Sequence, residues 1–330
     1  MTKIVLTGVK PTGIPHIGNY FGAIKPAIEL SKNPEYDAFF FIADYHALNF
    51  IKDKETLIKL TKEVACTWLA CGLDPNKIVF YKQSSVPEVT ELCWLLTGVT
   101  SKGLMNRAHA YKALVDKSVQ NGDDPDALVN MGLFNYPILM ASDILLFNTK
   151  FVPVGKDQKQ HVEMARDIAK AFNKRYGCTF VVPTEVIEDN VATIPGLDGR
   201  KMSKSYNNQI PLFCSQVELK KLISSIKTDS SLPNEPKSTD CAIFDLYKLF
   251  ASKQQVEEMK NRFEKGISWA EAKSELFTVM NNVLSPMREK YEYYMNNYGE
   301  VETILEKGAK KAREIAKQTI QRARTAIGLS

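Results

Sequence analysis

The chain has 330 residues, of which 44% are hydrophobic and 25% are charged. This composition is typical of globular proteins and excludes disordered, collagen-like and coiled-coil chains, and the length predicts about two domains of ~150 residues each. The 43 Lys and Arg residues against 38 Asp and Glu residues give a net charge of +5, which is too small to indicate nucleic-acid binding by itself.

The N-terminal sequence predicts neither a membrane segment nor a signal peptide. The longest apolar stretch near the start, residues 38–43, is far shorter than the ~20 residues that span a bilayer. Residues 1–3 lead directly into an apolar strand pattern, which leaves no room for the apolar region of a signal peptide. We therefore expect a cytoplasmic protein that makes no membrane contact.

The six cysteines are irregularly spaced and include no C-x-x-C pair. This spacing indicates neither a disulfide framework nor a zinc or iron–sulfur site, and we expect reduced thiols that are mostly buried.

Short β-type runs alternate with helical patterns over the first two-thirds of the chain, which predicts an α/β fold with a parallel sheet. Helices are expected after Asp53, from Pro87 and Glu88 onward, and after Gly155, where apolar residues recur at helical spacing. The expected strands are residues 4–7, 38–43, 78–81, 151–154 and 179–182.

Two stretches interrupt this alternation. Residues 116–126 are polar and rich in Gly and Asp, and residues 188–209 combine Pro, Gly, Lys and Ser without clear periodicity. Long loops within compact domains are usually functional or disordered. From about Tyr206 the strand patterns end and helical runs take over, separated by a polar stretch at 228–240, so we place a domain boundary there.

The last helical run, residues 300–330, carries one continuous apolar stripe and seven basic against four acidic residues. We interpret it as a helix packed on the core with a solvated outer face, the alternative being a contact with nucleic acid.

A glycine-rich segment, GVKPTGIPHIGNYFG at residues 8–22, follows the first strand. Backbone N–H groups at such a strand-to-helix turn bind phosphate, although tight turns also need glycine. The dinucleotide pattern G-x-G-x-x-G is absent. Gly8 and Gly13 have the spacing of a P-loop, but Ile14 and Pro15 stand where a P-loop needs Lys and Ser or Thr.

A second cluster, GRKMSKS at residues 199–205, lies in the long loop. A loop with two lysines and two serines can place charge on a triphosphate in its transition state, whereas the alternative is an exposed linker.

Together the two clusters resemble the paired signature of class I aminoacyl-tRNA synthetases, because KMSKS begins 185 residues after His16. Asn19 replaces the usual fourth residue, His, as in the small subgroup of tyrosyl and tryptophanyl enzymes. The resemblance implies a Rossmann-like nucleotide-binding domain at 1–205, with motif loops at 10–19 and 194–205. It also implies an all-α domain at 206–330 that recognises the tRNA anticodon, no editing domain, and a symmetric homodimer.

The choice between the two amino acids depends on one helical turn. An indole N–H only donates, so a tryptophan pocket needs one buried acceptor among apolar walls, whereas a phenol both donates and accepts. Asp143 lies among apolar residues, with Met140 one turn before it, where tyrosyl enzymes carry Gln. This pattern resembles the tryptophan-specific members of the subgroup. The alternative for Asp143 is a helix cap or a surface acid.

The segment Gly155-Lys156-Asp157-Gln158 also resembles the family pattern G-x-D-Q. The resemblance implies that Asp157 binds ribose hydroxyls and Gln158 the α-amine, while the alternative for Asp157 is a helix cap. His109 and His161 lack a carboxylate context, and we assign no metal to them. The residues expected to bind tryptophan are Leu6, His46, Tyr136, Met140, Asp143, Val152, Val154 and Gln158. For His46 and Tyr136 the alternative is a satisfied core residue.

The expected reaction is attack of the tryptophan carboxylate on the α-phosphate of ATP, followed by transfer of tryptophan to tRNA(Trp). Since the attacking carboxylate is already ionised, catalysis needs positioning and charge rather than a protein base. We assign these roles to Lys10, His16, Lys201 and Lys204, with Mg²⁺ held by phosphates and water. The full set expected at ATP is Lys10, Pro11, Thr12, Gly18, Asn19, Gly155, Lys156, Asp157, Ile194, Lys201, Met202, Ser203, Lys204 and Ser205.

Three alternatives remain open at this point. They are a tyrosyl enzyme, a non-catalytic tRNA-binding paralogue, and another nucleotidyl transferase of the same fold class.

Overall fold

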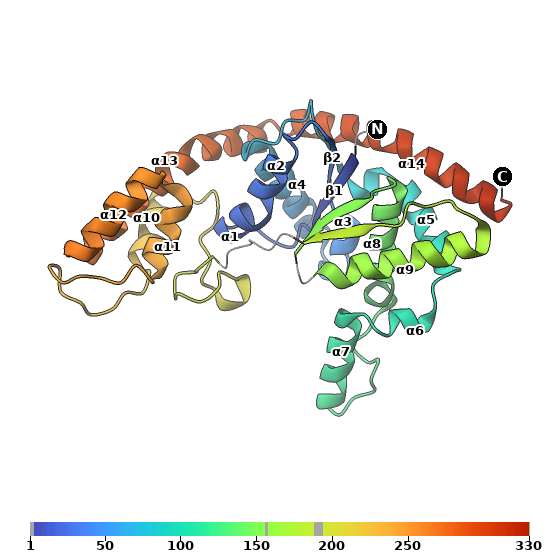
Figure 1. Ribbon diagram of the computed structural model, residues 1–330, viewed down its shortest axis with the longest axis horizontal. Coiled ribbons are helices and arrows are strands. Elements are labelled where there is room, and N and C mark those ends of the chain that lie inside the picture. The colour runs from blue at the N-terminus through green and yellow to red at the C-terminus, as the bar shows by residue number, and fades with distance from the viewer. Residues whose placement is uncertain (1–2, 156–157, 188–193, 330) are drawn as a thin grey trace.

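The computed structural model describes residues 3–155, 158–187 and 194–329. Its centre is a five-stranded parallel sheet in the order β3-β2-β1-β4-β5, which confirms the predicted α/β class (Figure 1). The strands are β1 (Lys3–Val9), β2 (Tyr36–Ile42), β3 (Val79–Lys82), β4 (Phe151–Val154) and β5 (Thr184–Ile187). The strand order reverses between β1 and β4, and ligands of doubly wound folds bind at such a switch point.

The fifth strand lies five residues later than predicted. Helix α9 (Lys159–Tyr176) ends at Gly177, and the Asn173 side chain then accepts hydrogen bonds from the backbone of Thr179 and Phe180. This turn directs Phe180 into the core against Phe172 instead of into the sheet. The apolar run at 179–182 therefore packs on the helix, and strand pairing begins only at Thr184.

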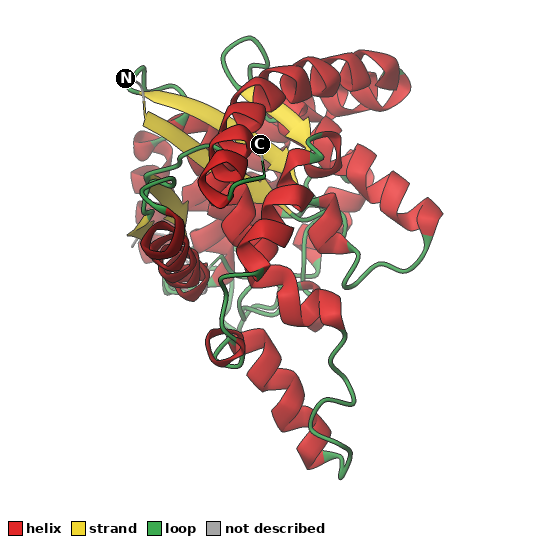
Figure 2. Cartoon of the chain, turned by 90° about the vertical axis from the view of Figure 1, so that its right-hand side faces the viewer, coloured by secondary structure: helices red, strands yellow, loops and turns green. Residues whose placement is uncertain are grey.

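Strand β2 explains why the sheet is covered on both faces. Phe40 and Ile42 belong to one buried cluster, whereas Phe39 and Phe41 belong to the other. Successive side chains of a strand point to opposite faces, so a central parallel strand with two apolar faces needs helices on both sides. Figure 2 shows helices on either side of the strands.

The helices divide between these two clusters. The first cluster takes the continuous helical run α1 (Ile17–Asn19), the π-turn Tyr20–Ile24 and α2 (Lys25–Leu30), together with α4 (Lys54–Ala70). The second takes α5 (Glu88–Thr97), α8 (Met131–Leu146) and α9. The predicted starts of α4 and α5 are confirmed, and Asp53 caps α4 by accepting from Thr56 N–H at 2.7 Å.

Three further helices connect these elements: α3 (Asp44–Ala47), α6 (Lys102–Met105) and α7 (His109–Gln120). Helix α7 and the turn after it project from the rest of the molecule (Figure 1). The predicted irregular stretch 116–126 is wrong over its first five residues, which complete α7.

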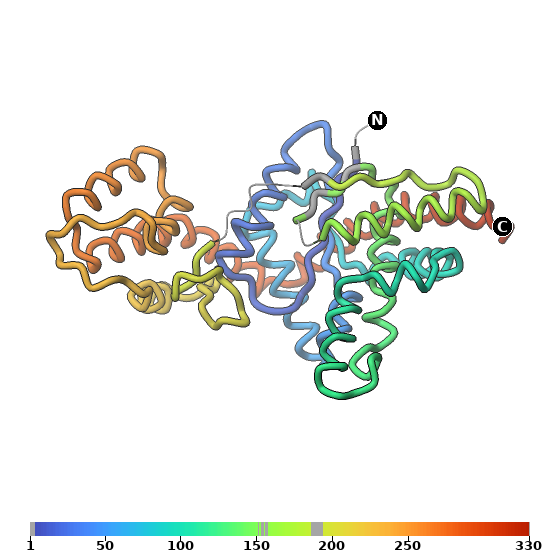
Figure 3. The backbone as a smooth tube through the Cα atoms, turned by 60° about the horizontal axis from the view of Figure 1, so that its bottom comes forward, coloured from blue at the N-terminus to red at the C-terminus, as the bar shows by residue number. Residues whose placement is uncertain are grey.

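From Tyr206 onward the described residues form helices and no named strand, as predicted. The helices are α10 (Gln216–Ser224), α11 (Ala242–Phe250), α12 (Lys253–Lys265), α13 (Trp269–Asn296) and α14 (Tyr298–Ile327). Helices α10 to α12 gather at one end of the molecule (Figure 3), and α13 connects them to α4 beside the sheet. The polar stretch 228–240 separates α10 from α11. The domain boundary expected at residue 206 stays a prediction. Helix α14, which follows that boundary, packs against β3 of the sheet.

Helix α14 runs along β3, the edge strand of the sheet. The predicted apolar stripe is buried at Val301, Leu305, Ala312, Ala316, Ile320 and Ala323. Two of its basic residues pair with α5: Arg313 with Glu88 at 2.9 Å, and Arg324 with Glu91 at 2.5 Å. These contacts support the interpretation of a helix packed on the core.

Gly308 lets α14 approach the backbone of β3. A Cβ atom at this position would overlap the backbone oxygen of Phe80. We expect Gly308→Ala to lower the free energy of unfolding by about 2 kcal/mol, because the helix or the strand must shift. Gly299→Ala is the matched control, since a Cβ there meets open space and should be neutral or slightly stabilising. Urea unfolding measures both, and equal stability of the two variants would contradict this close packing.

In the described ranges, no helix is long and apolar enough to cross a membrane. All six cysteines are free. Only Cys66 and Cys214 are buried, so the expectation of mostly buried thiols is wrong.

Candidate functional site

The predicted site residues gather at the carboxyl ends of β1 and β4. Strand β1 leads into the segment 10–19, and β4 leads into Gly155. Because these strands flank the switch point of the sheet, the two connections open on the same edge.

The first motif loop makes a tight turn before its helix. Thr12 N–H donates to the Lys10 carbonyl at 2.9 Å, and the chain enters the helix at Ile17 after the N-cap residue His16. His16 N–H donates to Asn19 Oδ1 at 3.1 Å, and Asn19 N–H donates to the His16 carbonyl at 2.8 Å. The Asn19 side chain therefore stabilises the first helical turn in this structure.

The structure brings the two motif loops into direct contact. Ile17 N–H donates to the Ile210 carbonyl, and Leu212 N–H to the Pro15 carbonyl, both at 3.0 Å. Gly18 N–H donates to the sulfur of Met202 at 3.4 Å. The two motifs lie 185 residues apart in the sequence. The fold joins the first loop to Met202 of the second, and to residues 210–212 just after it through backbone hydrogen bonds.

Gly13 shows how closely the Lys204 ammonium approaches the first loop. A Cβ at Gly13, whose φ is +150°, would overlap Lys204 Nζ. The second motif therefore places its last lysine directly over the turn of the first.

A small hairpin, residues 194–202, carries the second motif. Met202 N–H donates to the Ile194 carbonyl at 2.8 Å, and Gly196 N–H to the Arg200 carbonyl at 2.7 Å. The buried Asn208 closes the hairpin by donating to Asp198 at 2.6 Å and accepting from Ser203 N–H at 2.8 Å. The bond from Asn208 and the ion pair with Arg200 lower the pKa of Asp198 to about 2.

His16 is neutral at physiological pH. Burial, together with the positive charge of Lys204, lowers the pKa of His16 to about 4. Its Nδ1 is buried without a hydrogen-bond partner among the residues that the structure describes. His16 can therefore offer a hydrogen bond but no positive charge.

Lys204 places a side-chain amine close to the first motif loop. Partial burial of its ammonium lowers its pKa, and the negative charge of Glu63 on α4 opposes this shift. The Glu63 carboxylate therefore favours the charged form of the Lys204 ammonium.

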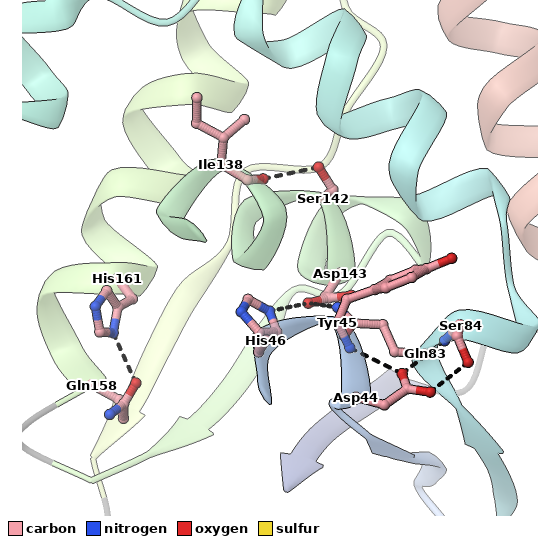
Figure 4. Close-up of polar contacts among 10 residues, drawn as sticks. All are labelled: Asp44, Tyr45, His46, Gln83, Ser84, Ile138, Ser142, Asp143, Gln158 and His161. Carbon is pink, nitrogen blue, oxygen red and sulfur yellow. Dashed lines mark hydrogen bonds and ion pairs between the residues drawn. The ribbon is translucent and has the colours of Figure 1, made fainter. Parts of the chain in front are cut away.

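Asp143 is the centre of a buried polar cluster (Figure 4). It lies within α8, 5% exposed, and its carboxylate contacts His46 Nε2 at 3.0 Å and Gln83 Nε2 at 2.9 Å from both oxygens. The position excludes the helix-cap and surface-acid interpretations. Burial raises the pKa of Asp143, while the bonds from His46 and Gln83 lower it.

A second polar chain connects α8 to the start of α9. Tyr136 OH lies 2.5 Å from His161 Nε2, and His161 Nδ1 lies 2.8 Å from Gln158 Oε1 (Figure 4 shows the second contact). If His161 donates from Nδ1 to the amide oxygen, its Nε2 accepts from the tyrosine hydroxyl. His161 thus fixes the orientation of both neighbours.

Apolar walls accompany these polar groups. Leu6 and Val152 are buried at 4% and 3% exposure in the cluster that also contains Ile144 of α8, and the half-buried Met140 packs against it. Val154 ends β4, and Gly155 follows it. The remaining predictions of the G-x-D-Q segment, Lys156 and Asp157, lie outside the described residues.

The other predicted nucleotide-site residues lie along the two loops. Pro11, Ile194 and Met202 are buried, Ser203 is half-buried, and Lys10, Thr12, Lys201 and Ser205 are exposed. The Lys10 ammonium lies 5.4 Å from the centre of the Phe50 ring. The backbone of Lys201 pairs with that of Pro195. No described contact joins the Lys201 side chain to Lys204.

Sequence reasoning missed three residues. Gln83 directly follows β3, and a polar residue at the carboxyl end of a parallel strand is the signal that could have found it. His161 has no sequence context for metal binding, and the signal for its role as a hydrogen-bonding residue is its position three residues after the G-x-D-Q segment. Asn208 has no local signal, because its role depends on the hairpin that it closes.

The part of the chain that the structure describes contains no group of three or more His, Cys, Asp or Glu side chains able to hold a metal ion. The two motif loops instead offer lysine side chains and backbone N–H groups to an anion, and Asp143 of α8 supplies one buried carboxylate at the same site.

Comparison with known proteins gives consistent results. A profile of the family described as "tRNA synthetases class I (W and Y)" matches residues 2–285. The chain is 53% identical to the tryptophan–tRNA ligases of Bordetella parapertussis and Pseudomonas aeruginosa, over all of this chain and 74% of each relative. Its fold is similar to the tryptophanyl-tRNA synthetase of Campylobacter jejuni complexed with ADP and tryptophan. That comparison has a TM-score of 0.91 and 44% identity, and covers 99% of this chain and 100% of the other.

Proposed function

Because the chain belongs to the class I tRNA synthetases for tryptophan and tyrosine, we propose that the site at the β1–β4 edge activates tryptophan with ATP. The protein is an aminoacyl-tRNA synthetase, and the amino acid that it joins to tRNA is tryptophan. The observation that carries this choice is the buried Asp143 carboxylate with Met140 one turn before it, together with the 53% identity to tryptophan–tRNA ligases.

Asp143 accepts the indole N–H of the substrate. The indole offers a single donor, and an ionised carboxylate is the strongest acceptor that a buried site can present to it. Leu6, Met140 and Val152 contribute apolar surface, which suits the rest of the ring. A phenol could also donate to this carboxylate, but its oxygen needs a donor of its own, and Met140 supplies none at the position where tyrosyl enzymes carry Gln, so tyrosine is disfavoured.

The chain Tyr136–His161–Gln158 orients the amino group of tryptophan. With its proton donated to His161, the Tyr136 oxygen is left to accept from an ammonium group. Gln158 lies beside Gly155, where the backbone of β4 ends. His46 supports the adjacent Asp143 from α3.

In the chemical step, a carboxylate oxygen of tryptophan forms a bond to the α-phosphorus of ATP, and the bond from that phosphorus to the bridging oxygen of pyrophosphate breaks. The products are tryptophanyl-adenylate and pyrophosphate, and no proton needs to move. Lys204 stabilises the charge that develops on the phosphates, and neutral His16 donates a hydrogen bond. The ribose hydroxyl at the end of tRNA then takes the acyl group and AMP leaves.

ATP binds against the two motif loops, with Lys10, Lys201 and the helix start at Gly18 and Asn19 facing its phosphates. Gly18 N–H donates to Met202 in this structure. Movement of the second motif loop, residues 194–205, would release this N–H group for a phosphate oxygen, so we propose that this loop closes and opens around the nucleotide.

Mg²⁺ enters as the complex with ATP. The donor set of the described residues fits this role, because it contains no cluster of three acidic or histidine side chains that would form a protein cage. Phosphate oxygens and water would be the ligands, as is usual for this ion. The ion supplies charge neutralisation of the phosphates when it is bound.

The helical segment 206–330 binds tRNA(Trp) and recognises its anticodon. A hollow of about 370 Å³ between α10 and α13 supports this proposal, because Lys220 and Lys273 line it together with Trp269 and Phe277. Lysines contact phosphates and aromatic rings stack on bases.

The active unit is a homodimer in the cytoplasm, where translation takes place. Exposed apolar side chains such as Trp94 on α5, at 76% exposure, support an interface on the sheet-bearing part of the chain.

Amino-acid-dependent exchange of pyrophosphate into ATP tests the function directly. The purified protein should catalyse exchange with tryptophan and not with tyrosine at equal concentration. Exchange with tyrosine alone would identify a tyrosyl enzyme. Absence of exchange with both would indicate a non-catalytic paralogue or a transferase that forms no acyl-adenylate.

A further inference from the structure

Gln83 lies where it can control the acceptor of the tryptophan site. It is the first residue after β3 and is 1% exposed. Its Nε2 lies 2.9 Å from both oxygens of Asp143, while His46 approaches only Oδ2, at 3.0 Å. The Gln83 amide therefore contacts both carboxylate oxygens, whereas the His46 ring contacts one.

The turn that carries Gln83 is anchored to the same short helix as His46. Ser84 N–H donates to Asp44 Oδ1 at 2.9 Å, and the Ser84 hydroxyl donates to Asp44 Oδ2. Asp44 begins α3, and His46 follows it by two residues. Helix α3 thus carries His46 and anchors the turn that carries Gln83. These are the two described residues outside α8 that contact Asp143 through hydrogen bonds.

The Gln83 amide is costly as a packing residue. Its Oε1 is buried and has no hydrogen-bond partner among the residues described, and an unpaired buried polar atom destabilises a fold. A methionine or leucine would fill this space without that cost. The contact of Gln83 Nε2 with the Asp143 carboxylate therefore explains the orientation of the amide. The Oε1 atom does not explain it, because it has no described partner.

We propose that Gln83 is a positioning residue that holds Asp143 in the ionised state and in the orientation that accepts the indole N–H. The inference rests on the proposed tryptophan specificity and names a determinant of it. Gln83 itself need not touch the substrate.

Several neighbouring groups change the pKa of Asp143, and Gln83 acts against those that raise it. Burial raises the pKa of Asp143 and the negative charge of Asp44 raises it further, whereas His46 and Gln83 lower it. Tyr81 of β3 and Cys93 of α5 also interact with the carboxylate: burial raises the pKa of each, and the negative charge of Asp143 raises it further. Of the two groups that favour the anion, Gln83 is the one with no ionisable side chain.

Gln83→Met tests the proposal, because methionine keeps the volume and removes the donor. Affinity for tryptophan at neutral pH should fall by about tenfold, as expected for loss of a bond to a charged group, with kcat at saturating tryptophan little changed. Since the pKa of Asp143 then rises further, the loss of affinity on acidification should begin at a higher pH than in the wild type. Isothermal titration calorimetry over a pH series measures both effects.

Selectivity provides a second readout. 3-(Benzothiophen-3-yl)alanine has the shape of tryptophan but no ring N–H, so its kcat/KM in pyrophosphate exchange should be nearly unchanged in Gln83→Met. The preference for tryptophan over this analogue should therefore fall by about the same tenfold. Ser142→Ala is the control, because this buried neighbour of Asp143 donates to the Ile138 carbonyl within its own helix. The control should keep both the preference and the pH profile.

Gln83→Glu keeps the shape of the side chain and covers the case in which the methionine variant fails to fold. Two facing carboxyl groups share a proton, so its tryptophan binding should become strongly pH-dependent. Equal losses for tryptophan and the analogue, with an unshifted pH profile, would overturn the proposal and leave Gln83 a packing residue. Failure of the wild type to prefer tryptophan over the analogue would instead contradict the assigned function of Asp143.

Discussion

Lys204→Ala should slow tryptophan-dependent pyrophosphate exchange by about a thousandfold while leaving tryptophan affinity within about twofold. Removal of a group that stabilises transition-state charge costs about 10²–10³ in rate, and cationic groups on transferring phosphates reach higher values. Lys204 Nζ lies over Gly13, on the side of the first motif loop, and no described contact joins it to Asp143 or Tyr136. Its loss should therefore affect the chemical step and not the amino-acid pocket. Exchange kinetics and calorimetric titration with tryptophan separate the two.

Lys221→Ala is the matched control for Lys204, since this exposed lysine of α10 lies outside both motif loops. The control should retain full exchange activity. Lys204→Arg keeps the charge but not the compact ammonium, so we expect partial activity from it. Equal losses of rate and of tryptophan affinity in Lys204→Ala would assign the residue to ground-state binding instead.

The sequence predicted most of the sheet because its central strands are apolar on both faces. Residues 38–43 form a continuous hydrophobic run, and the structure buries Phe39 and Phe40 in opposite clusters. The fifth strand was misplaced for the converse reason. Residues 180–182 are also apolar, but the tertiary contact of Phe180 with Phe172 takes the predicted strand at 179–182 out of the sheet. Local pattern cannot distinguish burial against a helix from pairing in a strand.

The candidate site was predictable where chemistry depends on a local motif. Glycines, lysines and the Asp143 segment carry their signal within a few residues, and the structure places them at one edge of the sheet. Gln83 and Asn208 act across distances of 60 and 10 residues, on Asp143 and Asp198 respectively. Their roles exist only once the fold brings these partners together, and a lone amide in a sequence does not indicate such a role.

Asp143→Asn should lower kcat/KM for tryptophan by about a hundredfold, which is the second large effect that we expect. The substitution preserves the shape of the side chain but replaces a charged acceptor by a neutral one, and bonds to charged groups contribute about 1.5–3 kcal/mol. The amide must also present either its oxygen or its NH₂ group to Gln83 Nε2, so one contact of the native cluster is lost. Exchange kinetics with tryptophan and with the benzothiophene analogue should show the loss for tryptophan alone.

The pH dependence of stability distinguishes this role from a structural one. Burial holds the pKa of Asp143 above its value in the unfolded chain, so the ionised carboxylate costs folding stability at neutral pH. This cost disappears as the pH falls through the raised pKa, because the folded state then binds a proton that the unfolded state does not yet hold. Activity depends on pH in the opposite sense, since tryptophan needs the anion. Asp143→Asn should therefore unfold in urea no more easily than the wild type at pH 7 and lose the acidic limb of the tryptophan kcat/KM profile. A variant with full tryptophan activity, or one that fails only because it unfolds, would show that the carboxylate serves the fold rather than the substrate.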